Sequence, residues 1–396
     1  MCRLQPQQDK YVIPIIDLNG TAYARGRQQG EGLRQAYREM IDEFFRSDLW
    51  HDNKPVALPD GLLRGALGVV GTVLTRQAIW RHLPLQHQRI VGLGQGLDAG
   101  QLFIWGVHFL EIMFCAAGKS LRAPGGCTQV HVQPRAAEDG KPWMGRNYDF
   151  PNMLQPYHVV RREVPSEAGR LATTTVTQIP LAGAHQGVNE AGLAVAANNA
   201  RLWPGRDLNR AGVPYMLILQ EILETCRTAA EARDRITRFP ARANAGFFGL
   251  LDETGECYVV EFTASRARVR TPDEHGVIAQ TNHYHDLTEA NLPRGTVWTV
   301  DGMKGLEYEY STGSRWEAAD RMLHELAGQL GLEPLKSILR DHSANGGVGS
   351  DATVCCHGAT GSTLASMIID VHERTLWIAN GTPCTARYEQ VPFRSR

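Results

Sequence analysis

The sequence predicts an α+β fold in which antiparallel sheets carry helices on their outer faces. Roughly the first 120 residues have mainly helical apolar periodicity, and short β-rich runs follow. Two later helical blocks are gathered between those runs and do not alternate regularly with single strands, as they would in a parallel doubly wound sheet. We therefore expect a helical segment at residues 1–126 and a layered α+β domain at residues 127–396.

Helices are predicted from apolar side chains at three- and four-residue spacing. Such a stripe within residues 22–45 consists of Leu33, Tyr37, Met40, Ile41 and Phe44. A second stripe predicts a helix at residues 99–114, and two further blocks at residues 214–239 and 314–330 are also helical in pattern.

Strands are predicted after a turn signal at residues 122–126, where a proline precedes two glycines. The β-rich runs are residues 128–133, 143–150, 172–179, 193–198, 246–251, 257–262, 277–281, 363–370 and 375–379. The turn-forming residues 139–142 join the first two runs, and residues 252–256 join the fifth and sixth. We expect a hairpin at each place.

Charge and hydropathy exclude several classes of partner. The 41 Lys and Arg residues nearly balance the 42 Asp and Glu residues, which gives no reason to expect a nucleic acid or an anionic membrane. No stretch reaches the roughly 20 apolar residues of a membrane span, and residues 1–10 lack the apolar core of a signal peptide. A cytoplasmic location is the expectation, and the oligomeric state stays open.

No cofactor or metal is expected. The glycines of residues 92–96 follow no strand and are interpreted as a turn at a helix boundary, and residues 358–363 lack the lysine of a phosphate loop. The histidines and cysteines His283, His285, Cys355, Cys356 and His357 match no standard zinc spacing. The eight cysteines include no CxxC pair, so most are expected to be buried and reduced.

One group of residues has the composition of a site for nucleophilic catalysis by a cysteine. Cys127 follows two glycines at the start of a predicted strand, and Arg146 and Asp149 lie on the next strand of the same hairpin. A guanidinium favours the reactive thiolate, and a carboxylate can hold an amine by a charge-assisted hydrogen bond. Scission of the Gly126–Cys127 bond would place an α-amine, with a pKa of about 7.7–8.0, beside the thiol as its base. Gly126 would leave the scissile carbonyl uncrowded.

Further motifs follow in a recognisable order. They are residues 20–26, 145–150, 187–193, 198–199, 281–282, 314–316 and 363–384. In this order they resemble the isopenicillin-N acyltransferase-like (acyl-coenzyme A:6-aminopenicillanic acid acyltransferase-like) family of N-terminal-nucleophile hydrolases, which is related to the choloylglycine hydrolases. The resemblance implies a four-layer αββα sandwich, self-cleavage at Gly126–Cys127, and two fragments that stay associated. It also implies a small-molecule amide or acyl-donor substrate and a thioester on Cys127.

The resemblance also implies roles for individual residues. Cys127 matches the nucleophile, with Arg146 and Asp149 beside it. Asn199 matches an oxyanion donor, although the adjacent Asn198 could take that place because only one of them points inward. Asn282 matches a second polar residue near the amine or the tetrahedral centre, and Arg315 matches a basic residue that supports the thiolate. A cation at the start of the helix predicted at residues 314–330 would oppose the helix dipole, which also indicates a task other than surface solvation.

Two alternatives remain open at this point. One is an uncleaved papain-like thiol hydrolase that uses His283 or His342 as its base. The other is a non-catalytic binding protein on the same fold. The apolar residues Tyr148, Phe150, Phe247 and Phe248 fit either an acyl pocket or the core, so neither the substrate nor the choice between hydrolysis and acyl transfer follows from the sequence.

Overall fold

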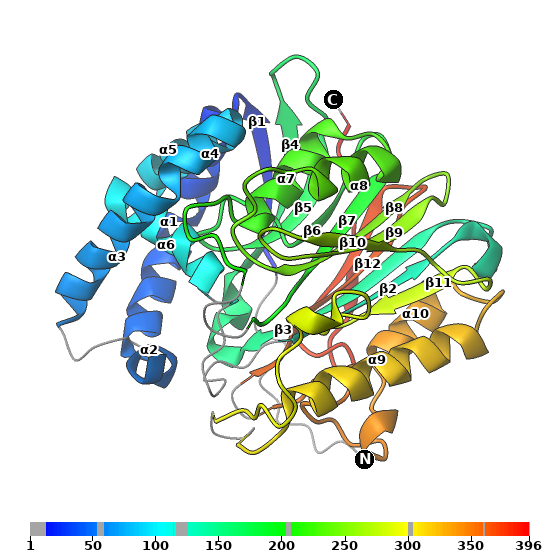
Figure 1. The fold of residues 1–396 in the computed structure, drawn as a ribbon. Helices are drawn as coiled ribbons and strands as arrows, with labels where there is room; N and C mark the ends of the chain where they lie inside the picture. Colours follow the sequence, from blue (N-terminus) through cyan, green and yellow to red (C-terminus); the bar gives the residue numbers. More distant parts are fainter. Residues whose placement is uncertain are drawn as a thin grey trace.

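Two antiparallel-rich sheets lie face to face, with helices on both outer faces (Figure 1). The computed structural model describes residues 13–53, 59–113, 115, 126–202, 207–299, 304–358 and 361–395. The polar residues 1–10 lie outside this range, as does the turn predicted at residues 122–126 apart from Gly126, which begins a strand. The four layers confirm the αββα fold class.

The first sheet has eight strands in the order β1-β4-β5-β6-β7-β8-β9-β10. Their bounds are β1 Ile15–Gly20, β4 His158–Pro165, β5 Thr173–Gln178, β6 Gln186–Asn189, β7 Leu193–Asn199, β8 Gly246–Asp252, β9 Cys257–Phe262 and β10 Ala267–Arg270. Only β1 and β4 pair in parallel. The β8–β9 hairpin is confirmed, and Asp252 Oδ1 closes its turn by accepting from the amides of Thr254 and Glu256.

The second sheet has six strands in the order β11-β2-β3-β12-β13-β14, all antiparallel. Their bounds are β2 Gly126–Val132, β3 Trp143–Pro151, β11 Val277–Gln280, β12 Gly361–Asp370, β13 Thr375–Asn380 and β14 Tyr388–Val391. The predicted β2–β3 hairpin is confirmed. In its turn the Lys141 amide donates to Asp139 Oδ1 at 3.0 Å, and Gly140 adopts a positive φ of 68°.

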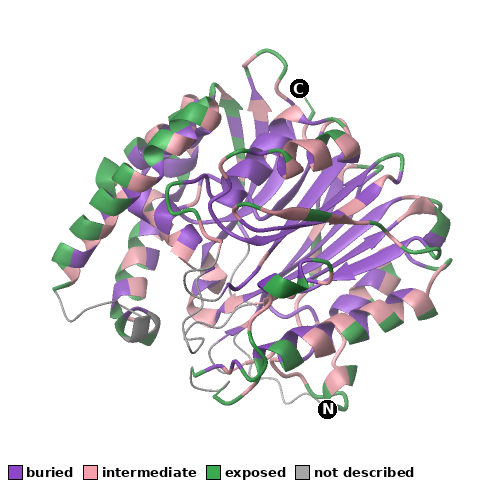
Figure 2. Ribbon diagram, viewed as in Figure 1, coloured by how far each residue is buried: buried purple, intermediate pink, exposed green. Residues whose placement is uncertain are grey.

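Four helices cover the outer faces of the sandwich. Helices α7 (Tyr215–Thr225) and α8 (Ala229–Thr237) pack on the eight-stranded sheet, and α9 (Tyr308–Glu325) and α10 (Leu332–Leu339) pack on the other. Figure 2 shows that the central strands between these layers are almost entirely buried, while the edge strands β1, β10 and β14 are partly exposed. The block predicted at residues 214–239 is two helices, because Thr228 starts a new one by accepting from the Glu231 amide.

The N-terminal segment contributes to the sandwich as well as to a helical layer beside it. Its helices are α1 Ala22–Arg46, α2 Asp48–Asn53, α3 Asp60–Leu74, α4 Arg76–His82, α5 Pro84–Leu97 and α6 Gln101–Met113. The strand β1 was not predicted, yet it pairs with β4 along its whole length. Strand β1 precedes residue 126 and its partner β4 follows it, so a cut at residue 126 would leave one sheet made of both fragments. The division at residue 126 stays a prediction about cleavage. None of the described helices is long and apolar enough to cross a membrane, and the cytoplasmic location also stays a prediction.

Glycines bring α1 and α5 into close contact. A Cβ at Gly26 would lie 2.1 Å from the Arg89 carbonyl oxygen, and one at Gly92 would lie 2.1 Å from the Tyr23 carbonyl oxygen. The interpretation of residues 92–96 as a turn was therefore wrong, because these glycines lie inside α5, where Gly92 and Gly96 face α1 and Gly94 faces α6. The small size of these glycines lets neighbouring helix backbones approach each other, so close helix packing explains why glycine recurs within residues 92–96.

This contact predicts opposite effects for two glycines of the same helix. We expect Gly26→Ala to lower the free energy of unfolding by about 1–3 kcal/mol, since its methyl group would overlap the backbone of α5. Gly32 is exposed, and a Cβ at this position would have no atom within 4 Å. Gly32→Ala should therefore leave stability unchanged or raise it by up to about 1 kcal/mol. Urea unfolding followed by circular dichroism measures both, and equal losses would contradict the packing explanation.

Candidate active site

Cys127 lies near the start of β2, at one end of the buried space between the two sheets. The β2–β3 register pairs Gly126 with Asp149 and Cys127 with Tyr148. The Cys127 residue is 3% exposed. The hairpin therefore brings the predicted nucleophile next to the predicted carboxylate, as the sequence indicated.

Arg146 holds the sulfur of Cys127. Its Nη2 atom donates to Cys127 Sγ at 3.1 Å, and its Nε atom donates across the sheet interface to Asn198 Oδ1 at 3.1 Å. Burial raises the pKa of the Cys127 thiol, and the positive charge of Arg146 opposes that rise. Because burial is the larger effect, the thiol needs a base before it can attack a carbonyl carbon.

Asn282 and Arg315 hold the backbone of Cys127. The Cys127 amide donates to Asn282 Oδ1 at 2.9 Å, and Arg315 Nη2 donates to the same oxygen at 2.9 Å. Arg315 Nη1 donates to the Cys127 carbonyl oxygen at 2.8 Å. A side-chain amide, itself fixed by a guanidinium, is thus the acceptor for the backbone nitrogen of the candidate nucleophile.

Arg315 lies within helix α9, away from both ends of the helix. The helix begins at Tyr308, earlier than predicted, so Arg315 is buried in its third turn and the dipole argument for this residue does not apply. A Cβ at Gly126 would lie 2.9 Å from Arg315 Nη2. Glycine at position 126 leaves room for this guanidinium, which a larger residue there would displace from its hydrogen bonds to Cys127 and Asn282.

Asp149 has one satisfied oxygen and one free oxygen. Its Oδ1 atom accepts from Thr363 Oγ1 at 2.7 Å, where a bulge in β12 shifts the register against β3. Its Oδ2 atom lies 3.8 Å from Arg315 Nη1 and has no hydrogen-bond partner among the described residues. Burial raises the pKa of the Asp149 carboxyl, and Arg315 opposes this rise.

The two neighbouring asparagines have different surroundings. Asn198 Nδ2 donates to the carbonyl oxygens of Gln280 and Thr281, at 3.0 Å each, so its amide is used within the fold. Asn199 lines the cavity at Cys127, and its Oδ1 atom accepts from the Cys115 thiol at 2.7 Å. Because its oxygen is occupied, the amide nitrogen is the group that Asn199 can offer to a ligand.

Two adjoining cavities meet at this site. The first, of about 40 Å³, is lined by Gly126, Cys127, Arg146, Asp149, Asn199 and Asn282, among other residues. The second, of about 120 Å³, is lined mainly by apolar side chains of α1, α6 and the β5–β6 connection. Glu111, Tyr148, Phe150 and Met216 line both cavities. The structure thus assigns Tyr148 and Phe150 to the cavity walls.

The remaining aromatic and histidine candidates lie elsewhere. Phe247 and Phe248 are fully buried core residues. The His283 ring nitrogen Nδ1 lies 3.1 Å from Thr312 Oγ1, and His342 lies with Cys355, His357 and Cys384. Of the described residues that line the Cys127 cavity, none is a histidine. The described lining of this cavity therefore includes no imidazole, and His185 lines the adjoining cavity.

Residues 135–384 match the model of the family described as acyl-coenzyme A:6-aminopenicillanic acid acyl-transferase. The chain belongs to this acyl-transferase family. The match contains Arg146, Asp149, Asn199, Asn282 and Arg315, and it begins eight residues after Cys127. Family membership therefore covers most of the sandwich, and the role of Cys127 depends on the geometry described above.

Solved structures with similar folds were also found. The Caenorhabditis elegans N-acylethanolamine-hydrolyzing acid amidase ortholog is 16% identical, covering 62% of this chain and 93% of its own, with a TM-score of 0.42. A C2A mutant of conjugated bile acid hydrolase from Clostridium perfringens is 14% identical, covering 68% and 97%, with a TM-score of 0.42. Penicillin V acylase from Agrobacterium tumefaciens is 13% identical, covering 67% and 86%, with a TM-score of 0.43. No curated protein sequence matched the chain.

In this member of the acyl-transferase family, Glu111 is a site residue that the sequence analysis missed. It lies on α6 and lines both cavities, where its Oε1 atom accepts from the Met216 amide at 2.9 Å. Its Oε2 atom is buried without a hydrogen-bond partner among the described residues. Burial raises its pKa to about 8, so it is largely protonated at neutral pH. The sequence did contain one signal for Glu111, since it is the single acidic residue of a mainly apolar helix.

Glu111 should make folding stability depend on pH. Its pKa is higher in the folded protein than the ordinary 4.5, so its stabilising contribution is complete below pH 4.5 and is lost as pH rises toward 8. Glu111→Gln mimics the neutral form. Relative to this variant, the wild type should lose up to about 1.4 kcal/mol of unfolding free energy per pH unit within that window. Urea unfolding across the window measures the difference, with the exposed Glu389→Gln as control. Parallel pH profiles for wild type and Glu111→Gln would refute the assignment.

Proposed function

We propose that this protein is an N-terminal-cysteine amidohydrolase or acyltransferase, which cleaves its own Gly126–Cys127 bond and then acts through a thioester on Cys127. One observation carries the proposal. Arg146 contacts the sulfur of Cys127, and Asn282 accepts a hydrogen bond from its backbone nitrogen, so separate buried groups hold the two atoms. An ordinary strand cysteine needs neither contact.

The self-cleavage step follows from these contacts. The Cys127 sulfur attacks the Gly126 carbonyl carbon, and the bond between that carbon and the Cys127 nitrogen breaks. The thiol proton passes to the nitrogen, which becomes the α-amine. Water then hydrolyses the resulting thioester and leaves a Gly126 carboxylate and the free thiol. Asp149 is paired with Gly126 in the β2–β3 register, and its Oδ2 atom, which has no hydrogen-bond partner among the described residues, can accept the thiol proton on its way to the nitrogen.

The same atoms serve substrate turnover. The α-amine takes the proton of the thiol, and the thiolate attacks the carbonyl carbon of the substrate amide. The amine then passes that proton to the leaving nitrogen as the carbon–nitrogen bond breaks. Water or an acceptor amine attacks the thioester to release the acyl group. Asn199 and Arg146 line the cavity, and Asn199 Nδ2 with Arg146 Nη1, which has no hydrogen-bond partner among the described residues, can donate to the developing oxyanion.

The adjoining apolar cavity supports a substrate with an apolar acyl group. Its lining is mainly aliphatic and aromatic, and it opens toward Cys127 at Tyr148 and Phe150. An apolar group placed there gains from leaving water, and this fixes the carbonyl carbon near the sulfur. The neutral Glu111 carboxyl at the junction can donate a hydrogen bond to the polar part of the substrate.

Cleavage should leave the two fragments associated. Residues 1–126 would keep the backbone pairing of β1 with β4 and the buried ion pairs of Arg25 with Glu163 and Glu224. These contacts join the N-terminal segment to residues on the other side of the scissile bond. A stable two-fragment enzyme is therefore part of the proposal.

Intact-mass analysis tests self-cleavage. The wild type should give two masses that meet at Gly126/Cys127, and the fragments should co-elute in gel filtration. Cys127→Ala should give one unbroken chain without amidase activity, because it lacks the attacking sulfur. Cys226→Ser is a matched control, since it alters a buried cysteine outside the cavity. An active wild type that stays unbroken would favour the papain-like alternative, and an intact, inert wild type would favour a binding protein.

Acyl-chain selectivity tests the substrate class. Val107 of α6 lines the apolar cavity, and Val107→Phe should fill part of it. We expect kcat/KM for chromogenic amides with long acyl chains to fall at least about tenfold, and the value for the acetyl analogue to change much less. Val69→Phe, on the exposed face of α3, should change neither. An equal loss for short and long acyl chains would place the acyl group elsewhere.

A further inference from the structure

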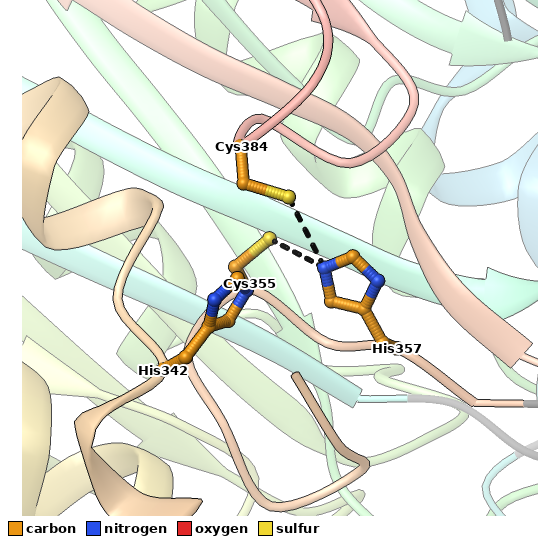
Figure 3. A group of neighbouring side chains, drawn as sticks. All are labelled: His342, Cys355, His357 and Cys384. Atoms are coloured by element: carbon orange, nitrogen blue, oxygen red, sulfur yellow. Dashed lines mark hydrogen bonds between the residues drawn. The ribbon is translucent and has the colours of Figure 1, made fainter. Parts of the chain in front are cut away.

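Four potential metal ligands converge beside the six-stranded sheet, outside the cavities at Cys127 (Figure 3). His342 follows α10, Cys355 and His357 lie on the loop before β12, and Cys384 lies between β13 and β14. One ligand atom from each residue lies within 4.8 Å of the others. Three separate loops thus contribute side chains to one small volume.

The spacing of the ligand atoms fits a tetrahedral ion. His357 Nε2 lies 3.3 Å from Cys355 Sγ and 3.2 Å from Cys384 Sγ. Around zinc, with bonds of about 2.0–2.3 Å, neighbouring ligand atoms are roughly 3.3–3.8 Å apart. A neutral imidazole nitrogen is either one donor or one acceptor, so hydrogen bonding serves at most one of the two sulfurs well. A cation between them serves all three atoms.

His342 supplies an independent observation. Its Nε2 atom is buried and has no hydrogen-bond partner among the described residues. Its ring lies 4.9 Å from the ring of His357, at an angle of 72°. A buried ring nitrogen without a partner is costly unless it binds a ligand. Its place in the cluster makes it the fourth ligand of the same ion.

We infer that His342, Cys355, His357 and Cys384 bind one zinc ion in a closed structural site. On binding, the two thiols release two protons to solvent, and two thiolates with two neutral imidazoles complete the coordination. The two negative sulfurs neutralise the ion, which suits a half-buried position. Four protein ligands leave no open position for water, so the ion would stabilise structure and would not take part in catalysis.

The site connects loops that support the catalytic carboxylate. Between two of the ligands, the Cys356 amide donates to Thr363 Oγ1 at 3.0 Å, and that hydroxyl donates to Asp149 Oδ1. The Cys355 amide donates to the Asp341 carbonyl oxygen, next to His342. An ion that fixes Cys355 and His357 therefore also fixes the segment that orients Asp149.

Metal content tests the inference directly. We expect about one zinc per full-length chain by mass spectrometry of purified protein. The reduced, metal-stripped protein should bind cobalt with the visible absorption of a tetrahedral thiolate site, and added zinc chloride should displace the cobalt. Zinc should also raise its thermal midpoint. Cys127→Ala should bind zinc and cobalt as tightly as the wild type, so this outcome is independent of self-cleavage.

Ligand variants decide between this site and its alternatives. Cys384→Ser and His342→Ala should each weaken zinc binding by more than about 100-fold, the upper end of the loss caused by removing an outer-shell partner. Cys226→Ser should bind like the wild type. Unchanged zinc affinity in both ligand variants would overturn the inference, as would a reduced wild type that binds neither cobalt nor zinc. A Cys355–Cys384 disulfide in the purified protein, with no metal bound after its reduction, would also overturn it. If a variant fails to fold, the cobalt spectrum of the wild type still decides.

Discussion

The buried guanidinium of Arg315 is the interaction on which the candidate active site depends. It donates to the Cys127 carbonyl oxygen, to Thr128 Oγ1 and to Asn282 Oδ1, and it lies 3.8 Å from the Asp149 carboxylate. A buried charge is costly without a partner, and here Asp149 supplies the opposite charge while the other oxygens use the N–H groups. Arg315 thus ties α9 to the first residues of β2, and its bulk explains why position 126 holds glycine.

A second set of buried charges joins the N-terminal segment to the sandwich. Arg25 of α1 and Arg89 of α5 contact Glu163 of β4 and Glu224 of α7, and all four side chains are almost fully buried. Burial alone would raise the pKa of Glu224, but Arg25 and Arg89 outweigh it and hold this pKa below its ordinary value. Breaking such a buried pair leaves an uncompensated charge, so separation of the segment from the sandwich would be strongly unfavourable. None of these contacts runs through the peptide bond at residue 126, which supports the proposal that the fragments stay associated after a cut there.

The parts of the structure that sequence reasoning predicted are those encoded locally. The β2–β3 hairpin follows from alternation and from the turn at Asp139 and Gly140, and it alone brings Cys127, Arg146 and Asp149 together. Asn282 and Arg315 reach Cys127 across 155 and 188 residues, so only the family resemblance indicated them. The strand β1 was missed because its partner β4 is distant in sequence. The cluster of His342, Cys355, His357 and Cys384 was missed for a related reason, since its ligands come from three loops with no regular spacing.

The uncleaved chain contains an unsatisfied atom that the proposed cleavage would satisfy. Before cleavage the Cys127 nitrogen has one hydrogen, which Asn282 Oδ1 accepts, and the buried Asp149 Oδ2 faces Arg315 at 3.8 Å but has no hydrogen-bond partner among the described residues. After cleavage the same nitrogen carries two or three hydrogens. Asn282 can keep the first, and the β2–β3 register places Asp149 beside the new terminus to accept a second. A buried polar atom without a partner destabilises the state that contains it, so this oxygen favours the cleaved form over the precursor. Little else in the site needs to move, because Arg146 and Arg315 already hold the sulfur and the carbonyl oxygen.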